Sequence, residues 1–557
     1  MKRTILLMLV ITMIGCSNSG RSLSEDPIRI HINQIGYLPD LDKVAVVSGP
    51  AQTFEVLRVA DGQVVLADSL TEPRFWDASG ESVRLADFSA VTLPGRYRLS
   101  VAGTPSAEFE IGSSVYSDIG TAGLKSYYFQ RASTELLTEF AGRWARPAGH
   151  PDDEVRVHAS AAGPERRTGD VISSPKGWYD AGDYNKYIPN SAITVATLLF
   201  LQEHYPDLAS GIDAHIPESG NAMPDLLDET RWNLDWMLTM QDPADGGVYH
   251  KLTNLSFDGM ELPHLTVEPR YVVMKTTQAA LTFAGTMALA ARIFAEQDPA
   301  FAARCLDAAR AAWRWAEINP NVIYRQPADV QTGEYKEEML EDERLWAATE
   351  LSISTGGELE MPLIETATVP EWRDFAAMGL ISQLNVDPNG PARTVLLRLA
   401  DELVAIADEH PYGVSNHHFR WGSNSDFLNQ ALVLISAYRI TGEQPYLNAA
   451  AADLDWVLGR NPHDLCFVSG FGAASPRNLH HRPSAGDGID DPIPGFVIGG
   501  PNPENTYDCG AEAYASTLPA LAYLDELCSY ATNEVAINWN APFVYVCFAL
   551  MSRTGSL

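Results

Sequence analysis

The first part of the chain alternates between hydrophobic and polar positions in short runs. Residues 28–32 (IRIHI) and 97–101 (YRLSV) alternate strictly, and residues 44–47 (VAVV) form a compact apolar run. Asp-Gly, Ser-Gly and Pro-Gly pairs separate these runs. Short strands at this spacing, with turn formers between them, predict a small all-β domain over residues 27–112 that folds as a β-sandwich.

After residue 112 the apolar positions recur at the spacing of a helix. Long polar connections rich in Gly and Pro separate these segments, and such connections in a compact domain usually carry function. A closed ring of helical hairpins and an α-solenoid both fit the pattern, but the lack of a repeat of about 34 or 40 residues favours the ring. Residues 113–557 are therefore expected to be mainly α, with about twelve helices, near residues 116–140, 187–206, 223–241, 275–297, 299–318, 341–355, 371–384, 391–409, 424–440, 444–459, 513–525 and 539–552.

The N-terminus has the pattern of a secretory signal. Lys2 and Arg3 precede an apolar run at residues 5–14, which is too short to span a bilayer. The run ends in Met-Ile-Gly-Cys, which resembles a bacterial lipobox in which Cys16 becomes lipidated. Residues 1–26 are expected to be a lipoprotein signal peptide and short linker. The mature protein would be exported, periplasmic or at the cell surface, and would touch the membrane only through its lipid anchor. Ordinary signal cleavage beside an incidental cysteine is the alternative.

The charge of the chain restricts its partners. Its 39 basic and 72 acidic residues give a formal net charge of −33. Such an acidic surface repels phosphate backbones and anionic lipids, so we expect no nucleic-acid partner. An uncharged ligand needs no electrostatic steering and is compatible with this surface. The sequence gives no indication of an oligomeric state.

Cysteine use fits an exported protein. Five of the six cysteines follow Cys16. In an oxidising compartment one disulfide is plausible, and Cys509 and Cys528 lie near each other in the sequence. The sequence contains no Cys-x-x-Cys pair, so it does not suggest a thiolate zinc site.

A first candidate for chemistry is Gly-Trp-Tyr-Asp-Ala-Gly-Asp-Tyr at residues 177–184. Asp180 and Asp183 are three residues apart with a glycine between them, so both can point into one cavity from a turn. Closely spaced carboxylates couple their titrations and can hold a water molecule for deprotonation. A helix cap or a calcium loop would use the same residue types.

The second candidate is Glu534, within Ala-Thr-Asn-Glu-Val-Ala-Ile-Asn-Trp-Asn-Ala-Pro at residues 531–542. Small, amide and apolar neighbours can raise the pKa of this carboxyl and keep it protonated as an acid. The alternative is a glutamate that interacts with the dipole of the last helix.

A third candidate is Leu-His-His-Arg-Pro-Ser at residues 479–484. Adjacent histidines cannot both face one metal from a regular helix, and ligands at zinc-like spacing are absent. Donors such as His480 and Arg482 fit a polyhydroxylated ligand better, although a basic surface turn would look the same. His250 adds a further donor in a loop. The sequence carries no serine-hydrolase elbow, Walker or dinucleotide signature.

Together these segments closely resemble glycoside hydrolase family 9, the cellulase family with an (α/α)6 barrel. The likeness covers nearly the whole mature chain. Residues 30–39 (IHINQIGYLP) resemble the start of the immunoglobulin-like module that precedes this barrel in one subgroup. The resemblance therefore implies an immunoglobulin-like β-sandwich at residues 27–112 and an (α/α)6 catalytic barrel at residues 113–557.

The resemblance also implies roles for the carboxyl groups. Asp183 matches the general base that activates water, Asp180 its partner in holding that water, and Glu534 the general acid. Asp180 and Asp183 would then be ionised and Glu534 protonated. The family inverts anomeric configuration, which requires an acid and a base about 6.5–9.5 Å apart with water between them.

Substrate contacts follow in the same way. His480 and Arg482 resemble the groups that hold the sugar beside the scissile bond, and His250 resembles a further subsite donor. Trp539, in the segment of Glu534, is expected to bind substrate. Asn185 is a departure, because many relatives have Gly after this DAGDY sequence.

Catalysis in this family needs no cofactor, but its members often carry structural calcium. Asp342 and Glu343, at an acidic helix start, resemble part of one calcium site, although acidic helix starts are common. Cys509 and Cys528 resemble a disulfide of the subgroup, although the residues around Cys509 are less typical.

The leading hypothesis is an endo-β-1,4-glucanase that acts on cellulose or related β-glucans. Alternatives are an exo-acting β-glucosidase or β-glucosaminidase, and a xyloglucan or mixed-linkage glucanase. A glycan-binding lipoprotein without catalysis is a further class. The presence of Asp180, Asp183 and Glu534 argues against it, because a binder needs no acid and base.

Overall fold

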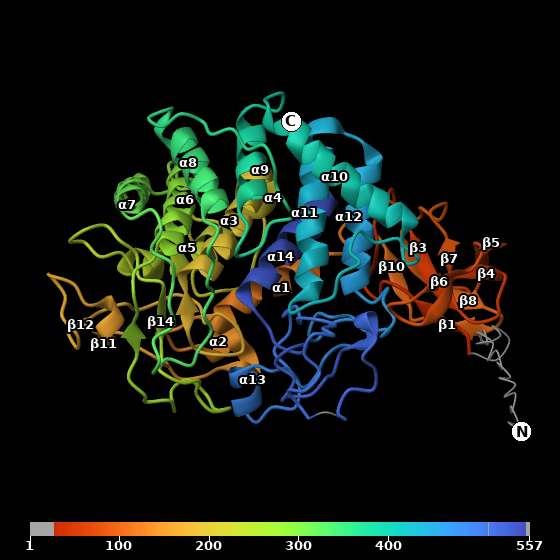
Figure 1. The fold of residues 1–557 in the computed structure, drawn as a ribbon. Coiled ribbons are helices and arrows are strands. Elements are labelled where there is room, and N and C mark those ends of the chain that lie inside the picture. Colours follow the sequence, from red (N-terminus) through yellow and green to blue (C-terminus); the bar gives the residue numbers. More distant parts are fainter. Residues whose placement is uncertain (1–26, 511, 553–557) are drawn as a thin grey trace, which may run out of the picture.

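The computed structural model describes residues 27–510 and 512–552, and Figure 1 shows its two parts. Strands make up the chain as far as Ile111, and helices dominate from Ser117 onward. The predicted signal peptide and Cys16 lie outside the described residues. Within the described part of the chain, no helix is long and apolar enough to cross a membrane.

The N-terminal part is a β-sandwich. One antiparallel sheet has the order β1-β3-β7-β6, with β1 (Arg29–His31), β3 (Val44–Ser48), β6 (Arg74–Trp76) and β7 (Glu81–Asp87). The other has the order β2-β10-β8-β4-β5, with β2 (Gly36–Tyr37), β4 (Thr53–Arg58), β5 (Val64–Ser69), β8 (Gly95–Val101), β10 (Phe109–Ile111) and, beside β8, β9 (Thr104–Pro105). Alternation along β8 buries Tyr97, Leu99 and Val101 between the sheets and leaves Arg96 and Arg98 outside.

Helices of two kinds build the second part. Those buried on nearly every face are α3 (Ile188–His204), α6 (Thr277–Ile293), α9 (Ala376–Val386), α11 (Ser423–Thr441) and α14 (Ile537–Ser552). Those with partly or fully exposed positions as well are α1 (Ser117–Gln130), α5 (Asp225–Thr239), α7 (Pro299–Ile318), α8 (Glu341–Thr355), α10 (Ala392–Glu409) and α12 (Gln444–Val457). In α10, for example, the buried residues are spaced by three or four and form one stripe, at Ala392, Leu396, Ala400, Leu403 and Ala407.

The helices form a double ring. Helices α3, α6, α8, α9, α11 and α14 contact one another in sequence, and α14 closes the circle against α3. Helices α1, α5, α7, α10 and α12 alternate with them along the chain and pack on the outside. The outer place between α8 and α9 holds the irregular residues 356–375. The architecture confirms the expected mainly α barrel behind a β-sandwich.

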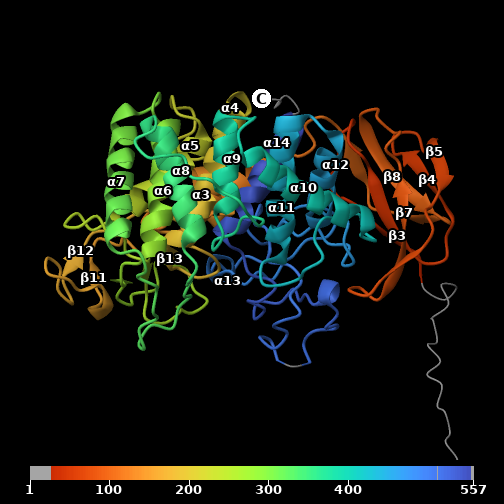
Figure 2. The same ribbon diagram turned by 45° about the horizontal axis from the view of Figure 1, so that its top comes forward.

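The β-sandwich packs against the side of the helical barrel next to α10 and α12 (Figure 2). The Asn33 side chain donates to Asp455 in α12 at 2.7 Å, and the Gln34 backbone N–H donates to Leu458 at 2.9 Å. Trp76 contacts the Trp456 ring, with centroids 6.0 Å apart. The first domain also contacts the loops after α12, because Arg29 pairs with Asp464 and the Ala520 N–H donates to the Ala78 carbonyl.

One helix predicted from the sequence, at residues 513–525, is absent. Only a 3₁₀ turn at Pro519–Leu521 forms there. Proline lacks a backbone N–H and disfavours a helical conformation in the preceding residue, and Leu518 is indeed extended. The disulfide between Cys509 and Cys528 also ties the segment to a loop. Three short helices were not expected, namely α2 (Thr138–Ala141), α4 (Pro206–Ser210) and α13 (Arg482–Gly486).

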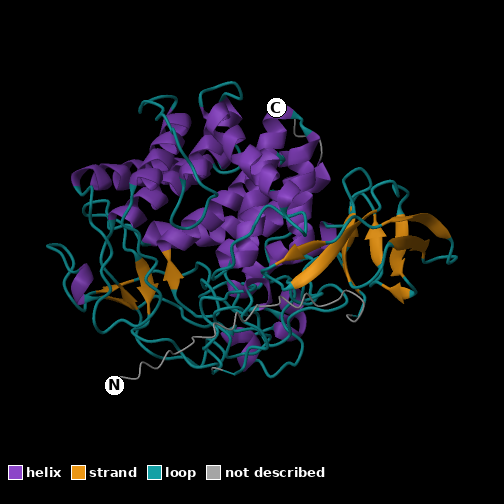
Figure 3. Ribbon diagram, turned by 45° about the vertical axis from the view of Figure 1, so that its right-hand side comes forward, coloured by secondary structure: helices purple, strands orange, loops and turns teal. Residues whose placement is uncertain are grey.

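A small sheet between the loops was also not expected. Its order is β12-β11-β15-β14-β13, formed by β11 (Val155–Val157), β12 (Val171–Ile172), β13 (Lys186–Tyr187), β14 (Lys251–Thr253) and β15 (Tyr271–Val272). Figure 3 shows these strands among the loops below the helices. Because β13 directly follows the Asp180–Asp183 turn, its pairing with β14 places residues near Thr253 beside that turn.

Candidate active site

The structure brings the two carboxylate motifs together at the loop side of the barrel. Ala181 and Ala536 form an antiparallel bridge, and the Ile537 N–H donates to the Asp180 carbonyl at 2.9 Å. The Gly182 N–H donates to Oε1 of Glu534 at 3.3 Å. The general-acid candidate therefore lies directly against the middle of the turn that carries both aspartates.

The histidine-rich segment joins the same place. His480 lies beside Glu534 in a parallel bridge, and the Arg482 guanidinium donates to the Gly182 carbonyl at 2.8 Å. A Cβ on Gly182 would lie 2.1 Å from the His480 carbonyl oxygen. The glycine in this turn is therefore required by the close approach of the two segments.

Asp180 is almost fully buried and is held by neutral donors. Its Oδ1 accepts a hydrogen bond from Asn190 in the first turn of α3, and its Oδ2 accepts one from the Tyr335 hydroxyl, both at 2.7 Å. Burial, and next the charge of Asp183, raise the pKa of Asp180 to about 8. At neutral pH the pair therefore favours one negative charge, which differs from the expectation that both carboxyls are ionised.

Asp183 and Glu534 differ in their surroundings. Oδ2 of Asp183 accepts hydrogen bonds from the Asn185 side chain and from the Tyr187 hydroxyl. Desolvation, followed by the charge of Asp183, raises the pKa of Glu534 well above its usual range, and Arg482 opposes this only in part. Glu534 thus keeps a proton at neutral pH beside an acceptor carboxylate, as an acid and base pair requires.

Comparison with known proteins identifies the family. The family model described as "Glycosyl hydrolase family 9" matches residues 116–547, and the model described as "Cellulase N-terminal ig-like domain" matches residues 25–106. The chain belongs to glycosyl hydrolase family 9. It is 43% identical to a xyloglucan-specific endo-β-1,4-glucanase of Bacteroides ovatus, over 96% of each chain. It is 32% identical to endoglucanase D of Acetivibrio thermocellus, over 93% of this chain and 82% of the relative.

Solved structures agree with this membership. A family 9 protein of Bacteroides ovatus superposes with a TM-score of 0.88 at 41% identity, covering 94% of this chain and 98% of that one. A family 9 endoglucanase derived from a metagenome gives 0.86 at 36% identity, covering 94% and 99%. The protein is thus a glycosyl hydrolase of the endoglucanase type.

Tyr335 is a site residue of this family 9 hydrolase that sequence reasoning missed. It lies in the connection between α7 and α8, where no motif marks it. Its φ of +47° is unusual for a bulky residue. Its ring packs on Tyr187 at 4.7 Å between centroids, and its hydroxyl reaches Asp180. A positive φ cannot be read from the sequence, so no signal could have identified it.

The expected role of His250 as a sugar donor needs correction. His250 is fully buried and stacks on Tyr324. Its Nδ1 pairs with the Thr276 hydroxyl at 3.0 Å, and its Nε2 pairs with the Glu334 carbonyl at 2.8 Å. Neither ring nitrogen is available to a sugar. His250 instead holds the residue next to Tyr335.

The other predicted substrate contacts lie around the carboxyl groups. His480 is partly exposed, and its Nδ1 donates to the Leu527 carbonyl at 2.7 Å, which fixes its ring. Arg482 and Trp539 are mostly buried, and Trp539 packs against Gly422 and Gly499. Their contact with substrate stays a prediction.

Exposed aromatic side chains border this cluster. Tyr530 is 38% exposed, and its ring lies 5.9 Å from that of His480. Trp421 is 47% exposed and lies 5.5 Å from Tyr530. Phe257, 48% exposed, lies 5.5 Å from the Arg482 guanidinium. Two cavities, of about 460 and 860 Å³, lie elsewhere, beside the β-sandwich and beside α1 and α4.

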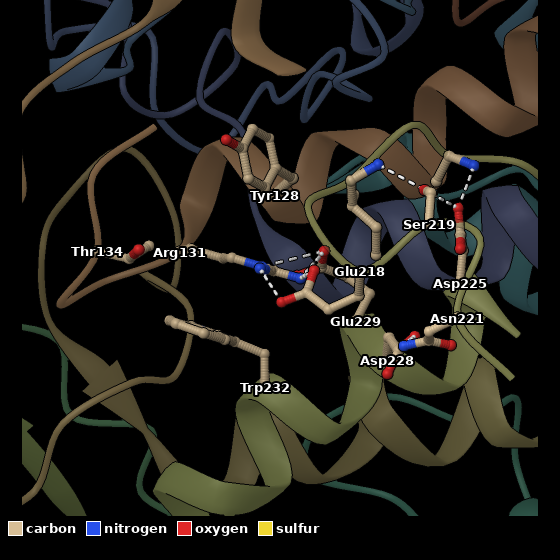
Figure 4. A network of polar contacts seen from close by, with 12 residues as sticks. Tyr128, Arg131, Thr134, Glu218, Ser219, Asn221, Asp225, Asp228, Glu229 and Trp232 are labelled. Atoms are coloured by element: carbon tan, nitrogen blue, oxygen red, sulfur yellow. Dashed lines mark hydrogen bonds and ion pairs between the residues drawn. The ribbon is translucent and has the colours of Figure 1, made fainter. Parts of the chain in front are cut away.

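A buried ionic network supports the aspartate turn from behind (Figure 4). The Arg131 guanidinium pairs with Glu229 at 2.9 Å and with Glu218 at 3.0 Å, between the rings of Tyr128 and Trp232. The Trp178 indole N–H also donates to Glu229, at 2.8 Å. Because Trp178 lies two residues before Asp180, this network fixes the start of the turn.

The predicted calcium residues form a separate acidic cluster. Glu343 is fully buried, and neither of its carboxyl oxygens has a hydrogen-bond partner within the described residues. Oδ2 of Asp342 accepts from the Phe375 N–H at 2.7 Å, which brings Asp374 near. Unpartnered buried carboxyl oxygens fit a hard cation such as Ca²⁺. Within residues 27–510 and 512–552, however, no three His, Cys, Asp or Glu side chains form a ready metal site.

The predicted disulfide is present. Cys509 and Cys528 are bonded, with their Cα atoms 5.2 Å apart. Cys305, Cys466 and Cys547 are free and buried. The disulfide closes the loop that leads to Tyr530 and Glu534.

Proposed function

We propose that this protein is an inverting endo-β-1,4-glucanase in which Asp183 is the base and Glu534 the acid. The observation that carries this proposal is the position of a proton-bearing Glu534 against the turn that holds Asp183. Glu534 gives its proton to the glycosidic oxygen as the bond from that oxygen to the anomeric carbon breaks. Water attacks the opposite face of the same carbon and passes a proton to Asp183, while Asp180 helps to hold that water.

Endo action is supported by the exposed aromatic residues. Sugar rings present apolar faces that stack on aromatic side chains, which combine a large contact area with a polar surround. Trp421 and Tyr530 extend from His480, whereas Phe257 lies beside Arg482. Aromatic surfaces next to both sugar-holding residues suit a polymer that continues past the cleaved bond in both directions.

Xyloglucan is the proposed preferred substrate among the β-1,4-glucans. The support is the 43% identity to a xyloglucan-specific relative over 96% of both chains. Cellulose shares the same backbone bond, so weaker activity on soluble cellulose derivatives is expected. The test compares xyloglucan, carboxymethylcellulose and mixed-linkage glucan at equal mass, with Glu534→Gln as the inactive control.

A fast fall in xyloglucan viscosity before small sugars accumulate is the expected result, together with α-configured reducing ends in early proton NMR spectra. Release of monosaccharide without a fall in viscosity would favour an exo enzyme. Binding of glucan without any new reducing ends would identify a non-catalytic lipoprotein.

We also propose that Cys16 is lipidated and tethers the exported enzyme to a bacterial membrane. The support is the basic start, the short apolar run and the lipobox-like sequence before Cys16. Labelling of the wild type with a radioactive fatty acid, and release of Cys16→Ser into the soluble fraction, are the expected results. Equal membrane recovery of Cys16→Ser would contradict the proposal.

Finally, we propose a structural Ca²⁺ held by Asp342 and Glu343. The support is the buried Glu343 carboxyl beside Asp342, because two charged carboxyls in such a place are strongly unfavourable without a cation. The ion would supply positive charge that ties the start of α8 to the start of α9, and it would take no part in the reaction.

A further inference from the structure

The side chain of Asn185 is directed at the proposed base. Asn185 is fully buried and lies two residues after Asp183. Its Nδ2 donates to Oδ2 of Asp183. Its backbone carbonyl accepts the Asp180 N–H at 3.0 Å, which closes the turn that carries both aspartates. One residue therefore contacts both carboxyl-bearing residues of the turn.

The orientation of this carboxamide is fixed by its other partners. Oδ1 of Asn185 accepts a hydrogen bond from the Asn254 backbone N–H at 2.9 Å and contacts the Thr253 hydroxyl at 2.9 Å. A backbone N–H can only donate, so the amide oxygen must face Asn254 and the NH₂ group must face Asp183. The strand β14 thus determines which group Asn185 presents to the base.

The Asn185 amide is a neutral donor to an Asp183 carboxylate that lies among several other charged groups. The groups that face it are the carboxyls of Asp180, Glu534 and Asp258, the ammonium of Lys251, the His480 ring and the Tyr187 hydroxyl. The ammonium of Lys251 is engaged by the Thr332 hydroxyl and the Gly333 carbonyl, at 3.0 and 2.6 Å. A direct hydrogen bond to the charged form of an acid favours that form. The Asn185 amide supplies such a hydrogen bond without the full charge of a cation.

We propose that Asn185 is a positioning residue that aims the Asp183 carboxylate and, by donating to it, favours its charged form. This inference rests on the proposed function. A glycine at this position would have no side chain to donate, so Asn185 extends the activity of the enzyme toward acid.

The test measures kcat and KM on soluble xyloglucan from pH 4 to pH 9 for the wild type, Asn185→Gly and Asn185→Asp. Loss of the donor moves the acidic limb of the kcat/KM profile upward by about one pH unit in Asn185→Gly, since one unit corresponds to about tenfold in activity on that limb. KM stays within about twofold, because the amide contacts Asp183 and not the sugar. Asn185→Asp keeps the shape of the side chain but adds a like charge, and it moves the limb further.

Asn461→Gly is the matched control for the loss of a buried asparagine. Asn461 is fully buried, and its amide donates to the Trp456 and Leu465 carbonyls, away from the carboxyl cluster. The Asn461→Gly substitution should lower the melting temperature but leave the pH profile of kcat/KM unchanged. Acidic limbs of both Asn185 variants within about 0.2 units of the wild type, or a change in KM alone, would overturn the inference.

Asp183→Ala is measured in parallel to separate the two hypotheses. If this variant keeps wild-type turnover, the proposed function itself fails. If it is inactive while both Asn185 variants keep the wild-type profile, only the role of Asn185 fails. Should Asn185→Gly not fold, the near-isosteric Asn185→Asp decides the question alone.

Discussion

Glu229 in α5 contacts the start of the turn that carries Asp180, and these two buried carboxyl groups are held in opposite ways. Glu229 pairs with the Arg131 guanidinium and accepts from the Trp178 indole. Within the described residues, the side-chain donors to the Asp180 carboxyl are the neutral groups of Asn190 and Tyr335, and its pKa is raised to about 8 by burial and by Asp183. A paired cation makes a carboxylate a fixed part of the scaffold, whereas neutral donors leave it able to gain and lose protons.

The same contrast holds for the side chains around these two carboxyl groups. The ionic network around Arg131 is satisfied and holds the backbone before Asp180 in place. The cluster of Asp180, Asp183 and Glu534 concentrates carboxyl groups without a compensating cation in direct contact. The proposed chemistry therefore lies on the uncompensated group, and the compensated group supports the backbone beside it.

The largest effect is expected from substitutions in the cluster of Asp180, Asp183 and Glu534, which has no cation in direct contact. Asp183→Ala and Glu534→Gln should each lower kcat on a soluble β-glucan by at least about 10³-fold, because each removes one partner of the proton transfer. The melting temperature should stay the same or rise, since a buried carboxyl is lost. Turnover near the wild-type value in either variant would contradict the assignment of Asp183 as the base and Glu534 as the acid.

The second prediction concerns the ionic network of Arg131 with Glu229 and Glu218. Arg131→Met should lower the free energy of unfolding by about 3–5 kcal/mol, because it leaves the Glu229 charge buried without its cation. Urea titration followed by circular dichroism measures the change. The control is Arg310→Met at the exposed pair with Glu358, where about 1 kcal/mol or less is expected. Equal losses of unfolding free energy in Arg131→Met and Arg310→Met would contradict the role given to the buried Arg131 network.

A third prediction removes one neutral donor. Tyr335→Phe should reduce kcat by about tenfold to a hundredfold, because a hydrogen bond to a charged or titrating group contributes about 1.5–3 kcal/mol. KM should change little. Tyr446→Phe, which loses a hydroxyl contact with Asp401 between α10 and α12, should keep full activity. An active Tyr335→Phe would show that Asn190 alone can hold Asp180.

The fourth prediction concerns Glu343, which has neither a cation nor neutral donors. Ca²⁺ at 1 mM should raise the melting temperature over that in EDTA, with a stabilisation of about 2–4 kcal/mol if the free ion exceeds its dissociation constant by about a hundredfold or more. Glu343→Gln should lose this response. A wild-type melting curve that is the same with Ca²⁺ and EDTA would mean that a proton, not a metal, neutralises Glu343.

The smallest expected effect is the pH dependence of stability due to Asp180. Its folded pKa lies above its ordinary value, so its stabilising contribution is complete below about pH 4 and is lost as the pH rises through about 8. Asp180→Asn removes this loss. The melting temperature of the variant relative to the wild type should therefore rise between pH 4 and pH 8, by a few degrees. A constant difference would place Asp180 among the compensated carboxyls.

Local patterns explain how much the sequence could predict. Alternation along β8 identified a strand because one face is buried, and the regular apolar spacing of α10 identified a helix because one stripe is buried. The DAGD and HHRPS segments were recognisable because their residues are contiguous. The helix predicted at residues 513–525 failed because Pro519 and a disulfide overrode its apolar spacing.

Other features depended on contacts between distant segments. His250 looked like a free donor, but its burial against Tyr324 and the Glu334 carbonyl follows from packing. Tyr335 carries no local signal, because its backbone conformation and its reach to Asp180 come from the loops around it. The small sheet formed by β11 to β15 has strands too short to show any periodicity.

The amino-acid sequence by itself determined the type of most long elements and the chemical identity of the proposed catalytic groups, because both depend on neighbouring residues. Only the tertiary structure decided which carboxyls stand beside a cation and which do not. The shift of a carboxyl pKa depends on burial and on charges a few ångströms away, and in a ring of helices those neighbours come from segments hundreds of residues apart. Glu534 and Gly182 meet only because α14 closes the ring against α3.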